Sequence, residues 1–201
     1  YQDARFKLVD LPGTYSLLST STDEEVARDF ILFGQPDVTV VVVDATRLER
    51  NLNLVLQVLQ ITDRAVVCLN LIDEAKRHNI VVDDRRLARD LGVPVVPTAA
   101  RGGDGIPLLL QTVSDVASGR VVCKPRRSKS EPAALKSALD RLEDQVETAF
   151  PNLPNGRWVA LRLLEGDRRI VEAVRSGDLG DLNQSGGLDP RGELAAASEA
   201  N

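Results

Sequence analysis

Asp10 and Gly13 are the first residues in the chain whose types and spacing suit a chemical role. The apolar, β-favouring run from Phe6 to Val9 precedes Asp10, so we expect a strand that ends at this carboxylate. A carboxylate at a strand end can hold a magnesium-bound water, and a glycine three residues later lets a backbone N–H approach a phosphate. Because Pro12 precedes Gly13, the same residues also make an ordinary turn. Alone, the spacing is only weak support for a nucleotide switch loop.

Asn70 and Asp73 form a second candidate pair, directly after the apolar run from Ala65 to Leu69. Ligands of open α/β sheets bind at the carboxyl ends of the strands, so this position suits a binding site. The Asp73 carboxylate can accept hydrogen bonds from guanine N1–H and the exocyclic amine, donors that adenine lacks at those atoms. The Asn70 amide can reach the purine N7 and brace neighbouring loops. An isolated Asn-x-x-Asp is better explained as a polar strand end that leads into a helix.

A third candidate segment follows the next predicted strand and consists of Thr98, Ala99 and Ala100. Its small side chains leave room for a base, and the backbone N–H of Ala100 is expected to face guanine O6. Asp44 follows the strand that lies between the first and second candidates. Each candidate comes directly after a predicted buried strand, and all come in the order that a nucleotide site requires. Together they predict a guanine-nucleotide-binding domain, which none of them predicts alone.

Strand and helix patterns alternate over residues 1–119. Beyond the strand before Asp10, β-branched and apolar runs predict strands at 38–43, 65–69 and 94–97. The first two of these runs are continuously apolar, which indicates burial on both faces. Helical spacing and capping residues predict helices at about 24–33, 48–60, 84–91 and 106–116, with Leu52, Leu56 and Leu59 on one face of the second. The predicted fold class is α/β, a doubly wound and mostly parallel sheet.

The pattern changes near residue 121, where basic residues and prolines predict a solvated linker at 121–131. Contact of this linker with an anionic membrane is an alternative interpretation. Helical patterns at about 132–149, 157–164 and 168–175 predict a small all-α bundle over residues 132–176. Its expected buried residues are Leu135, Leu139, Leu142, Trp158, Leu161 and Leu164. The tail, 177–201, is rich in Gly, Ala, Ser and Asp and is predicted to be disordered. The expected domains are thus an α/β domain at 1–120 and a helical domain at 132–176.

The composition argues against several classes of protein. The chain is 43% hydrophobic and 27% charged, as is usual for a globular protein, and its net charge of −5 argues against a general affinity for nucleic acid. Two cysteines cannot form a disulfide framework, which favours a reducing, cytoplasmic setting. The longest apolar stretch, Val38 to Val43, is far shorter than the ~20 residues that a spanning helix needs.

The chain resembles the cytoplasmic part of the bacterial ferrous iron transport protein B family over roughly residues 3–176. The segments most similar to the sequences of that family are residues 10–17, 44–52, 70–75 and 154–167. In the family, a G domain is followed by a helical spacer and a membrane permease domain. The resemblance implies a P-loop NTPase-like fold of the TRAFAC GTPase type. It also implies that Asp10 and Gly13 belong to the third GTPase loop, Asn70 and Asp73 to the fourth, and residues 98–100 to the fifth.

The resemblance further implies GTP or GDP as ligand, with Mg²⁺ held by Asp10 through a water. It implies a slow GTPase that regulates iron uptake through the permease domain on the cytoplasmic side of the bacterial inner membrane, with no nucleic-acid partner. Self-association into a homo-oligomer is left open. Ala99 stands where the family often has Ser, which removes a bracing hydroxyl but leaves the backbone contact to the base.

The phosphate-binding loop, Gly-x-x-x-x-Gly-Lys-Ser/Thr, does not occur in the 201 residues, and neither does a switch-one segment before Asp10. Losing about three charge-assisted hydrogen bonds of ~1.5–3 kcal/mol each lowers nucleotide affinity by roughly 10³- to 10⁶-fold. We therefore expect this chain alone to bind GTP hardly at all and to be inactive as a fragment. Thr14 also replaces the water-orienting glutamine of faster GTPases, so the complete protein should hydrolyse GTP slowly.

The missing loop also affects the expected topology. The strand before a P-loop would lie between the strands that end at Asp10 and Asp44, so either these two pair directly or the chain is a piece of a longer protein. The second alternative is favoured, because the chain begins with Tyr1 and enters a strand almost at once.

Three functional interpretations remain: part of a GTP-dependent ferrous iron transporter, a degenerate G domain used for docking, and an assembly GTPase that acts on RNA. The acidic charge and the lack of a basic appendage disfavour the third. His78 is the only histidine, so iron coordination by this chain is poorly supported.

Overall fold

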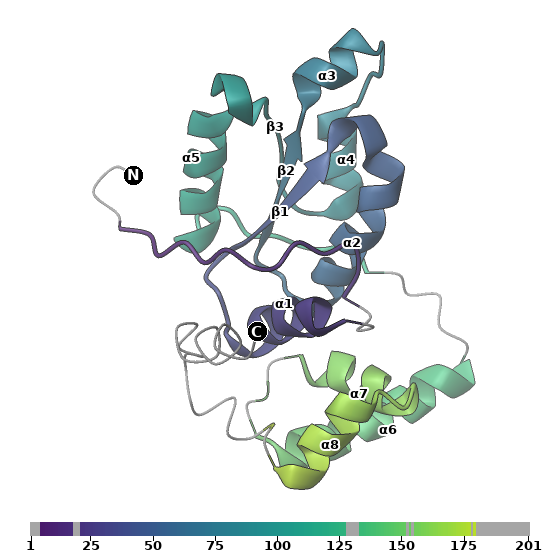
Figure 1. The fold of residues 1–201 in the computed structure, drawn as a ribbon. Helices are drawn as coiled ribbons and strands as arrows, with labels where there is room; N and C mark the ends of the chain where they lie inside the picture. Colours follow the sequence, from purple (N-terminus) through teal and green to yellow (C-terminus); the bar gives the residue numbers. More distant parts are fainter. Residues whose placement is uncertain are drawn as a thin grey trace, which may run out of the picture. The chain divides into compact units, whose positions relative to one another are not determined.

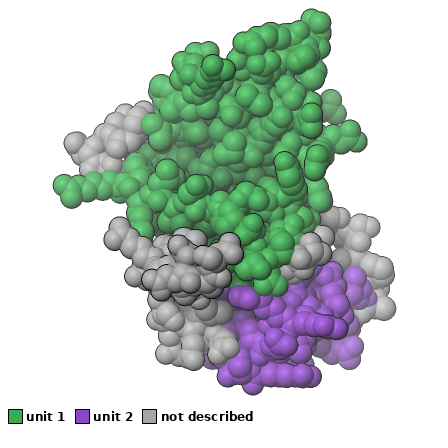
Figure 2. Space-filling model, in the orientation of Figure 1, with its two compact units in different colours: residues 1–31, 36–130 green, residues 32–35, 131–201 purple. Residues whose placement is uncertain are grey.

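The structure is a computed structural model that describes residues 5–17, 21–127, 133–151, 153, 155–177 and 179. It divides into two compact units, residues 1–31 with 36–130, and residues 32–35 with 131–201 (Figure 2). The first unit holds the described strands and most of the helices, and the second is all-α. The chain therefore combines an α/β unit with a helical unit.

Three parallel strands form the sheet of the α/β unit in the order β1 (Thr39–Asp44), β2 (Ala65–Asn70) and β3 (Val95–Pro97). Helix α5 (Ile106–Ala117) lies on one face of the sheet, and α2 (Leu48–Ile61) and α4 (Asp84–Leu91) lie on the other (Figure 1). The remaining elements between Thr22 and Gly102 are two α-helices, α1 (Thr22–Phe33) and α3 (Ile72–Arg77), and two short 3-10 helices, η1 (Ala45–Arg47) and η2 (Ala100–Gly102). The predicted doubly wound, parallel α/β arrangement is confirmed.

Strand β2 is the centre of this unit. Its first five residues are at most 4% exposed, because helices cover both faces and β1 and β3 flank its two edges. On the α5 side, Val116 packs with Val66 and Val96, so one apolar side chain from the helix spans two neighbouring strands. The prediction of a strand buried on both faces is correct for β2.

The same prediction is wrong for β1. Its side chains alternate between buried and exposed, and Val40 and Val42 are 37% and 59% exposed. Helix α2 covers the buried face, whereas no described helix covers the face that carries Val40 and Val42. A continuous run of valine therefore identified a strand correctly but overstated its burial.

The strand expected before Asp10 is also absent from the described residues. Residues 5–14 have no regular secondary structure, and Phe6 and Leu8 are exposed. Strand β1 pairs with β2 alone, so the direct pairing of residues 6–9 with β1, one of the two alternatives above, does not occur. A β-favouring run forms a stable strand only when a neighbouring strand receives its backbone hydrogen bonds.

Helix ends differ slightly from expectation. Helix α1 begins at Thr22 rather than Glu24, and the Ser21 hydroxyl accepts a hydrogen bond from the Glu24 amide at 3.3 Å.

In α2 the fully buried residues are Val55, Val58, Leu59 and Ile61. The predicted stripe is therefore wrong at Leu56, which is 47% exposed, because a leucine-rich helix offers two apolar stripes one residue apart.

Residues 121–127 run along the α/β unit instead of projecting into solvent. The amides of Lys124 and Arg126 donate to the carbonyls of Gly92 and Leu91 at 2.8 and 3.0 Å. The Arg127 guanidinium donates to the Leu59 carbonyl at the end of α2 at 2.8 Å. We call residues 121–127 the trailing strap; this described part of the predicted linker is attached to the α/β unit.

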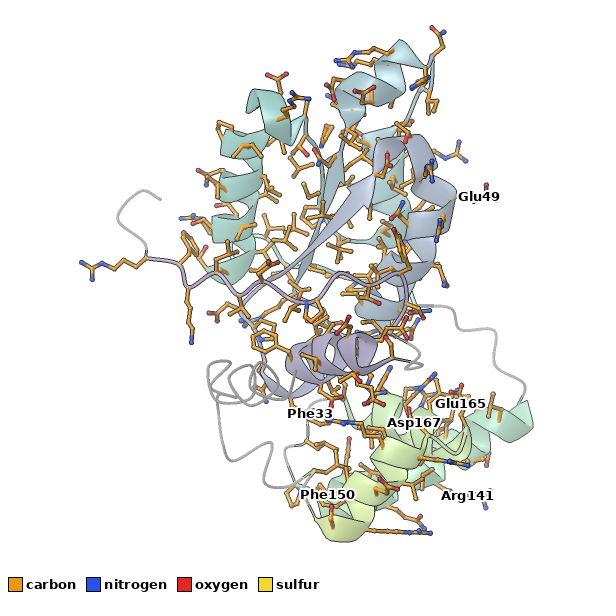
Figure 3. The ribbon with its side chains drawn as sticks, viewed as in Figure 1. Phe33, Glu49, Arg141, Phe150, Glu165 and Asp167 are labelled. Atoms are coloured by element: carbon orange, nitrogen blue, oxygen red, sulfur yellow. The ribbon has the colours of Figure 1, made fainter. Side chains whose placement is uncertain are left out.

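The helical unit contains α6 (Ala133–Ala149), α7 (Gly156–Leu164) and α8 (Arg168–Ser176). Its core is formed by Leu139, Val146, Trp158, Val159, Ala160 and Ile170. Asp167 lies in this unit (Figure 3), and its carboxylate accepts hydrogen bonds from the amides of Arg169 and Ile170, which fixes the start of α8.

The predicted core of the helical unit is partly correct. Leu139 and Trp158 are buried, and Leu142 and Leu161 are partly buried. Leu135 and Leu164 are 37% and 44% exposed, because they lie near the ends of α6 and α7, where fewer neighbours cover a side chain. Except for Gly177 and Leu179, the tail predicted to be disordered lies outside the described residues. None of the described helices is long and apolar enough to cross a membrane.

Candidate functional site

The carboxyl ends of β1 and β2 place Asp44 and Asn70 side by side, because the parallel register pairs these two residues. The Asp44 carboxylate accepts hydrogen bonds from the backbone N–H and the hydroxyl of Thr46, both at 2.7 Å. Asp44 therefore fixes the turn into η1 and α2.

Asn70 links the two loops that were predicted to surround a base. Its Oδ1 accepts a hydrogen bond from the Ala100 amide at 3.1 Å and one from the Thr98 hydroxyl at 3.3 Å. The bracing role expected for Asn70 is present in these contacts. The Ala100 amide, expected to face guanine O6, donates to Asn70 instead.

Thr98 is fully buried beneath this link. Its amide donates to the Leu69 carbonyl at 2.8 Å, and its carbonyl accepts from the Ile72 amide at 3.1 Å, so it joins the end of β2 to the start of α3. The Thr98 hydroxyl also lies 3.2 Å from the Cys68 thiol. Burial raises the pKa of the Cys68 thiol, and the hydrogen bond with Thr98 partly opposes that shift. The thiol is therefore a neutral packing group under the loop.

The loop after Thr98 is closed by a short bridge between Ala99 and Asp104, in which the Ala99 amide donates to the Asp104 carbonyl at 3.0 Å. Gly105 follows with φ +76°, and a Cβ placed there would lie 2.2 Å from the Pro97 carbonyl oxygen. Only glycine fits this close approach at positive φ. Sequence reasoning missed this role, although the turn-forming run Gly102-Gly-Asp-Gly105 was a usable signal.

Asp73 lies in the first turn of α3, after Leu71 in the left-handed conformation with φ 61°. Its carboxylate is 3.4 Å from the Arg77 guanidinium, which also contacts Glu74 at 2.6 Å. These side chains are between 39% and 65% exposed, so the ion pairs add little to stability. Arg77 was not predicted, and its contact with Asp73 could not be foreseen until α3 was known to include both residues.

Asp10 and Gly13 are exposed in the irregular segment before α1 and are not placed at a strand end. The residues after Gly13 do reach the site: a cavity of about 490 Å³ is lined by Tyr15 together with Asp44, Asn70, Arg47 and Arg50. Of the predicted site residues, the structure thus joins Asn70, Thr98 and Ala100 directly. It does not place Asp10 or Gly13 in the same cavity.

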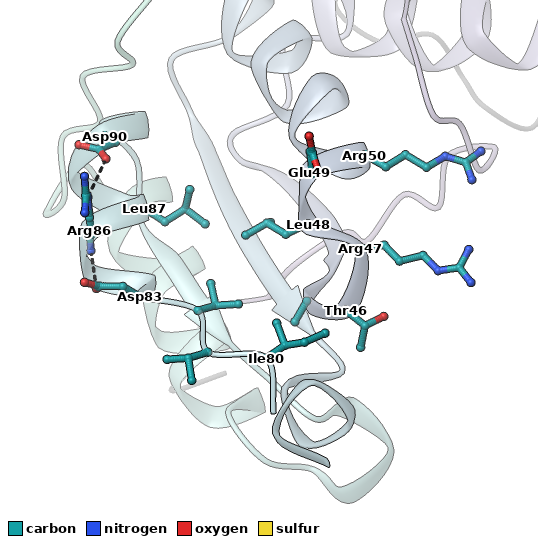
Figure 4. Close-up of a pocket in the computed structure, with 13 residues that line it drawn as sticks. Thr46, Arg47, Leu48, Glu49, Arg50, Ile80, Asp83, Arg86, Leu87 and Asp90 are labelled. Atoms are coloured by element: carbon teal, nitrogen blue, oxygen red, sulfur yellow. Dashed lines mark hydrogen bonds and ion pairs between the residues drawn. The ribbon is translucent and has the colours of Figure 1, made fainter. Parts of the chain in front are cut away.

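A larger hollow of about 630 Å³ lies away from the predicted site residues, between the start of α2, the segment 80–83 and α4 (Figure 4). Leu48, Ile80 and Leu87 contribute its apolar lining. On its rim, Arg86 pairs with Asp90 at 3.7 Å and donates its amide to Asp83. Within the described residues, no group of three His, Cys, Asp or Glu side chains is arranged to hold a metal ion.

A parallel sheet with helices on both faces, and loops clasped by Asn70 at the carboxyl ends of its strands, defines a P-loop GTPase-like fold, that of a G domain. Residues 1–113 match the model of the family described as ferrous iron transport protein B, and residues 132–191 match that of the FeoB cytosolic helical domain. The chain belongs to the ferrous iron transport protein B family and corresponds to its cytosolic part.

Curated relatives support this assignment. The Fe(2+) transporter FeoB of Escherichia coli K12 is 37% identical over 169 residues, which are 82% of this chain and 21% of the relative. A Fe(2+) transport protein A/FeoB fusion protein of Porphyromonas gingivalis is 36% identical over 86% of this chain and 21% of its own length. The chain therefore spans about one fifth of the length of these relatives.

Solved structures agree in fold. The cytosolic domain of the T. maritima FeoB iron transporter is 31% identical in a GDP form and in a GMPPNP form, with TM-scores of 0.72 and 0.74. The match covers 85% and 86% of this chain, and 66% and 67% of those chains. The FeoB G-domain from Methanococcus jannaschii is 44% identical over 55% of this chain and 69% of its own, with a TM-score of 0.54.

Proposed function

We propose that the α/β unit reads guanine nucleotides at the carboxyl ends of β2 and β3 and thereby regulates Fe²⁺ passage through a membrane permease domain. The observation that carries the proposal is the link from Asn70 to Thr98 and Ala100, because it holds the two predicted base-contacting loops together. The GDP and GMPPNP forms of the T. maritima relative, and the Fe²⁺ transport named for the curated relatives, support the ligand and the cargo. The unit would act on the cytoplasmic face of the bacterial inner membrane.

Asp73 is the proposed reader of the base. Its carboxylate would accept two hydrogen bonds from the guanine N1–H and exocyclic amine, donors that adenine lacks at those atoms. Arg77 lies close enough to share or release the carboxylate when a base arrives, and the exposure of both side chains leaves this exchange open to solvent. Ala100, which is exposed, would lie beside the base, and the buried side chains of Thr98 and Ala99 would support its loop from beneath.

Asp10 is the proposed partner of Mg²⁺, through a water molecule. Mg²⁺ keeps several waters and takes few protein ligands, so a single exposed carboxylate fits this role and an all-protein cage is not required. When bound, the ion neutralises charge on the nucleotide phosphates. Gly13 would offer its backbone N–H to the terminal phosphate, because a residue without a side chain lets the backbone approach a ligand closely.

Hydrolysis of GTP would require a version of the protein that includes a P-loop. The 201 residues carry no such loop, so we expect weak binding and no useful turnover by this chain alone. In a version with the loop, Thr14 after Gly13 leaves the attacking water without the orienting glutamine of faster enzymes, and turnover is slow.

Calorimetric titration with GTP and Mg²⁺ tests the proposal on the 201-residue chain and on a version extended upstream to include a P-loop. The proposal expects binding weaker than micromolar for the first and recovered binding for the second. Titration with ATP is the control for base reading. Micromolar binding by the shorter chain would show that the contribution of the missing loop is overestimated.

A docking module is the second candidate, and the coil conformation of residues 5–14 favours it, because Asp10 and Gly13 are not held in place there. Failure of the extended version to bind any guanine nucleotide would support this candidate over the first.

A further inference from the structure

The segment that follows Gly13 lies along α2 and is held there by two side chains. The Arg50 guanidinium lies 4.4 Å from the centroid of the Tyr15 ring. Gln57 Oε1 accepts a 2.6 Å hydrogen bond from the Leu17 amide and a 3.2 Å hydrogen bond from the Ser16 hydroxyl. Arg50 and Gln57 are seven residues apart in a helix, so they occupy the same face two turns apart.

Burial makes the Gln57 contact the stronger of the two. Leu17 is 3% exposed, so its amide would have little access to water if Gln57 released it. An unpaired buried donor shifts an equilibrium by roughly 5- to 100-fold, whereas a cation–π contact at an exposed ring such as Tyr15 shifts it by about 2- to 5-fold. Gln57 is therefore the main anchor of the segment, and Arg50 is an auxiliary one.

These contacts matter for the residues before them, of which Val9, Leu11 and Pro12 are partly buried and the others from 5 to 13 are exposed. Residues 5–14 take part in no strand or helix, and Gly13 is only four residues from Leu17. The anchor consequently limits where Gly13 can lie. Tyr15 and Arg50 also line the cavity that Asp44 and Asn70 share, so the anchored segment reaches the strand ends.

We propose that Gln57, assisted by Arg50, is a positioning residue that sets the location of Gly13 and Asp10 relative to the nucleotide. The inference rests on the proposed function for its nucleotide-dependent part only. The contact of α2 with residues 15–17 is a property of the chain itself, so it can be tested without a ligand.

Amide hydrogen exchange of the 201-residue chain is the first test. Gln57→Leu removes the acceptor and should accelerate exchange at Leu17 by roughly 5- to 100-fold. Gln57→Glu keeps an oxygen at the same place and should stay within about 2-fold of wild type. Gln60→Leu, at an exposed position of the same helix, is the matched control, and the Val67 amide in the sheet reports that the fold is intact. Unchanged exchange at Leu17 in Gln57→Leu overturns the proposal.

Nucleotide discrimination is the second test, in a version that carries an upstream P-loop. Gln57→Leu should reduce the affinity for GMPPNP relative to that for GDP by about 5-fold or more, because Gly13 would contact only the terminal phosphate. Gln57→Glu should restore the ratio, and Arg50→Leu should give a smaller change. An unchanged ratio together with faster Leu17 exchange overturns the positioning role. If the parent protein binds neither nucleotide, the proposed function fails, and the exchange result alone decides whether Gln57 anchors the segment.

Discussion

Asn70 and Ala100 are 30 positions apart in the chain, yet the Ala100 amide donates a 3.1 Å hydrogen bond to Asn70 Oδ1. The contact joins the end of β2 to the loop after β3, and Thr98 adds a second hydrogen bond to the same oxygen atom. The Asn70 side chain therefore adds to the backbone hydrogen bonds of Thr98 with Leu69 and Ile72 in holding the two loops together.

Asn70→Ala should destabilise the α/β unit by about 1–2 kcal/mol, because two donors lose their acceptor at a partly buried site. Urea unfolding of the chain, followed by far-UV circular dichroism, measures the change. Thr98→Val completes a double-mutant cycle, and a coupling energy near zero would show that the two side chains do not stabilise each other.

Asp73→Asn should shift the preference of a P-loop-containing version from GTP towards XTP. A carboxamide presents one donor and one acceptor, which suits the xanthine O2 where guanine carries its amine. Competition binding of GTP against XTP measures the shift. Glu74→Gln, which also alters an Arg77 partner, is the control and should leave the preference unchanged. Equal GTP selectivity in Asp73→Asn and wild type would remove Asp73 as the base reader.

Gly105→Ala should destabilise the chain by more than about 2 kcal/mol, since the added Cβ meets both the positive φ and the Pro97 carbonyl oxygen. Gly103→Ala is the matched control, because Gly103 has φ +81° with no atom within 4 Å of a Cβ. That control should lose only about 1–2 kcal/mol from strain. Thermal unfolding of both variants under one buffer condition compares them, and equal losses would mean that the close contact is relieved by a small backbone shift.

Trp158→Ala should unfold the helical unit, because truncating a buried tryptophan removes about 3–5 kcal/mol from a small bundle. Leu164→Ala, at a side chain 44% exposed, should change stability by less than about 1 kcal/mol. Loss of helical circular dichroism reports the first effect. Trp158 is the only tryptophan, so wild-type emission at the wavelength of an exposed indole would contradict its burial.

Alkylation of Cys68 should be slow in the folded chain at neutral pH, because burial raises the pKa of its thiol and restricts access. A raised folded pKa means that the stability from keeping this thiol neutral is complete below the unfolded pKa. That stability is then lost as pH rises through the folded pKa. Iodoacetamide labelling followed by mass spectrometry should show rates that rise with pH and with urea. Rapid labelling of Cys68 at pH 7 without urea would refute its burial.

Much of the fold follows from local pattern. The runs at β1 and β2 and the spacing in α2, α4 and α5 place these elements within one or two residues, because each carries a strong apolar period and clear end signals. The exposure of Val42 could not be predicted in this way. It depends on which helix covers β1, and the local sequence does not contain that information.

The candidate site could likewise be predicted only in part from the sequence. The bracing role of Asn70 follows from its position after a buried strand. The coil conformation around Asp10 did not follow from its apolar neighbours, because a strand depends on a partner elsewhere in the chain. Gln57 shows the reverse case: its position on a helix gave no sign of the loop that it anchors, and only the folded chain shows the contact.

The trailing strap has a mechanical consequence. Residues after 127 connect to the α/β unit through Arg127, which bonds to the Leu59 carbonyl and to Asp63, and then through Arg126 and Lys124. A pull on the chain from its carboxyl side would load Arg127 first and peel the strap backwards one bond at a time. Helix α5 would carry no tension until that peeling had passed residue 121. The attachment points of the strap are therefore the ends of α2 and α4, together with the Ala65 carbonyl at the start of β2, which accepts a hydrogen bond from the Cys123 thiol at 3.6 Å.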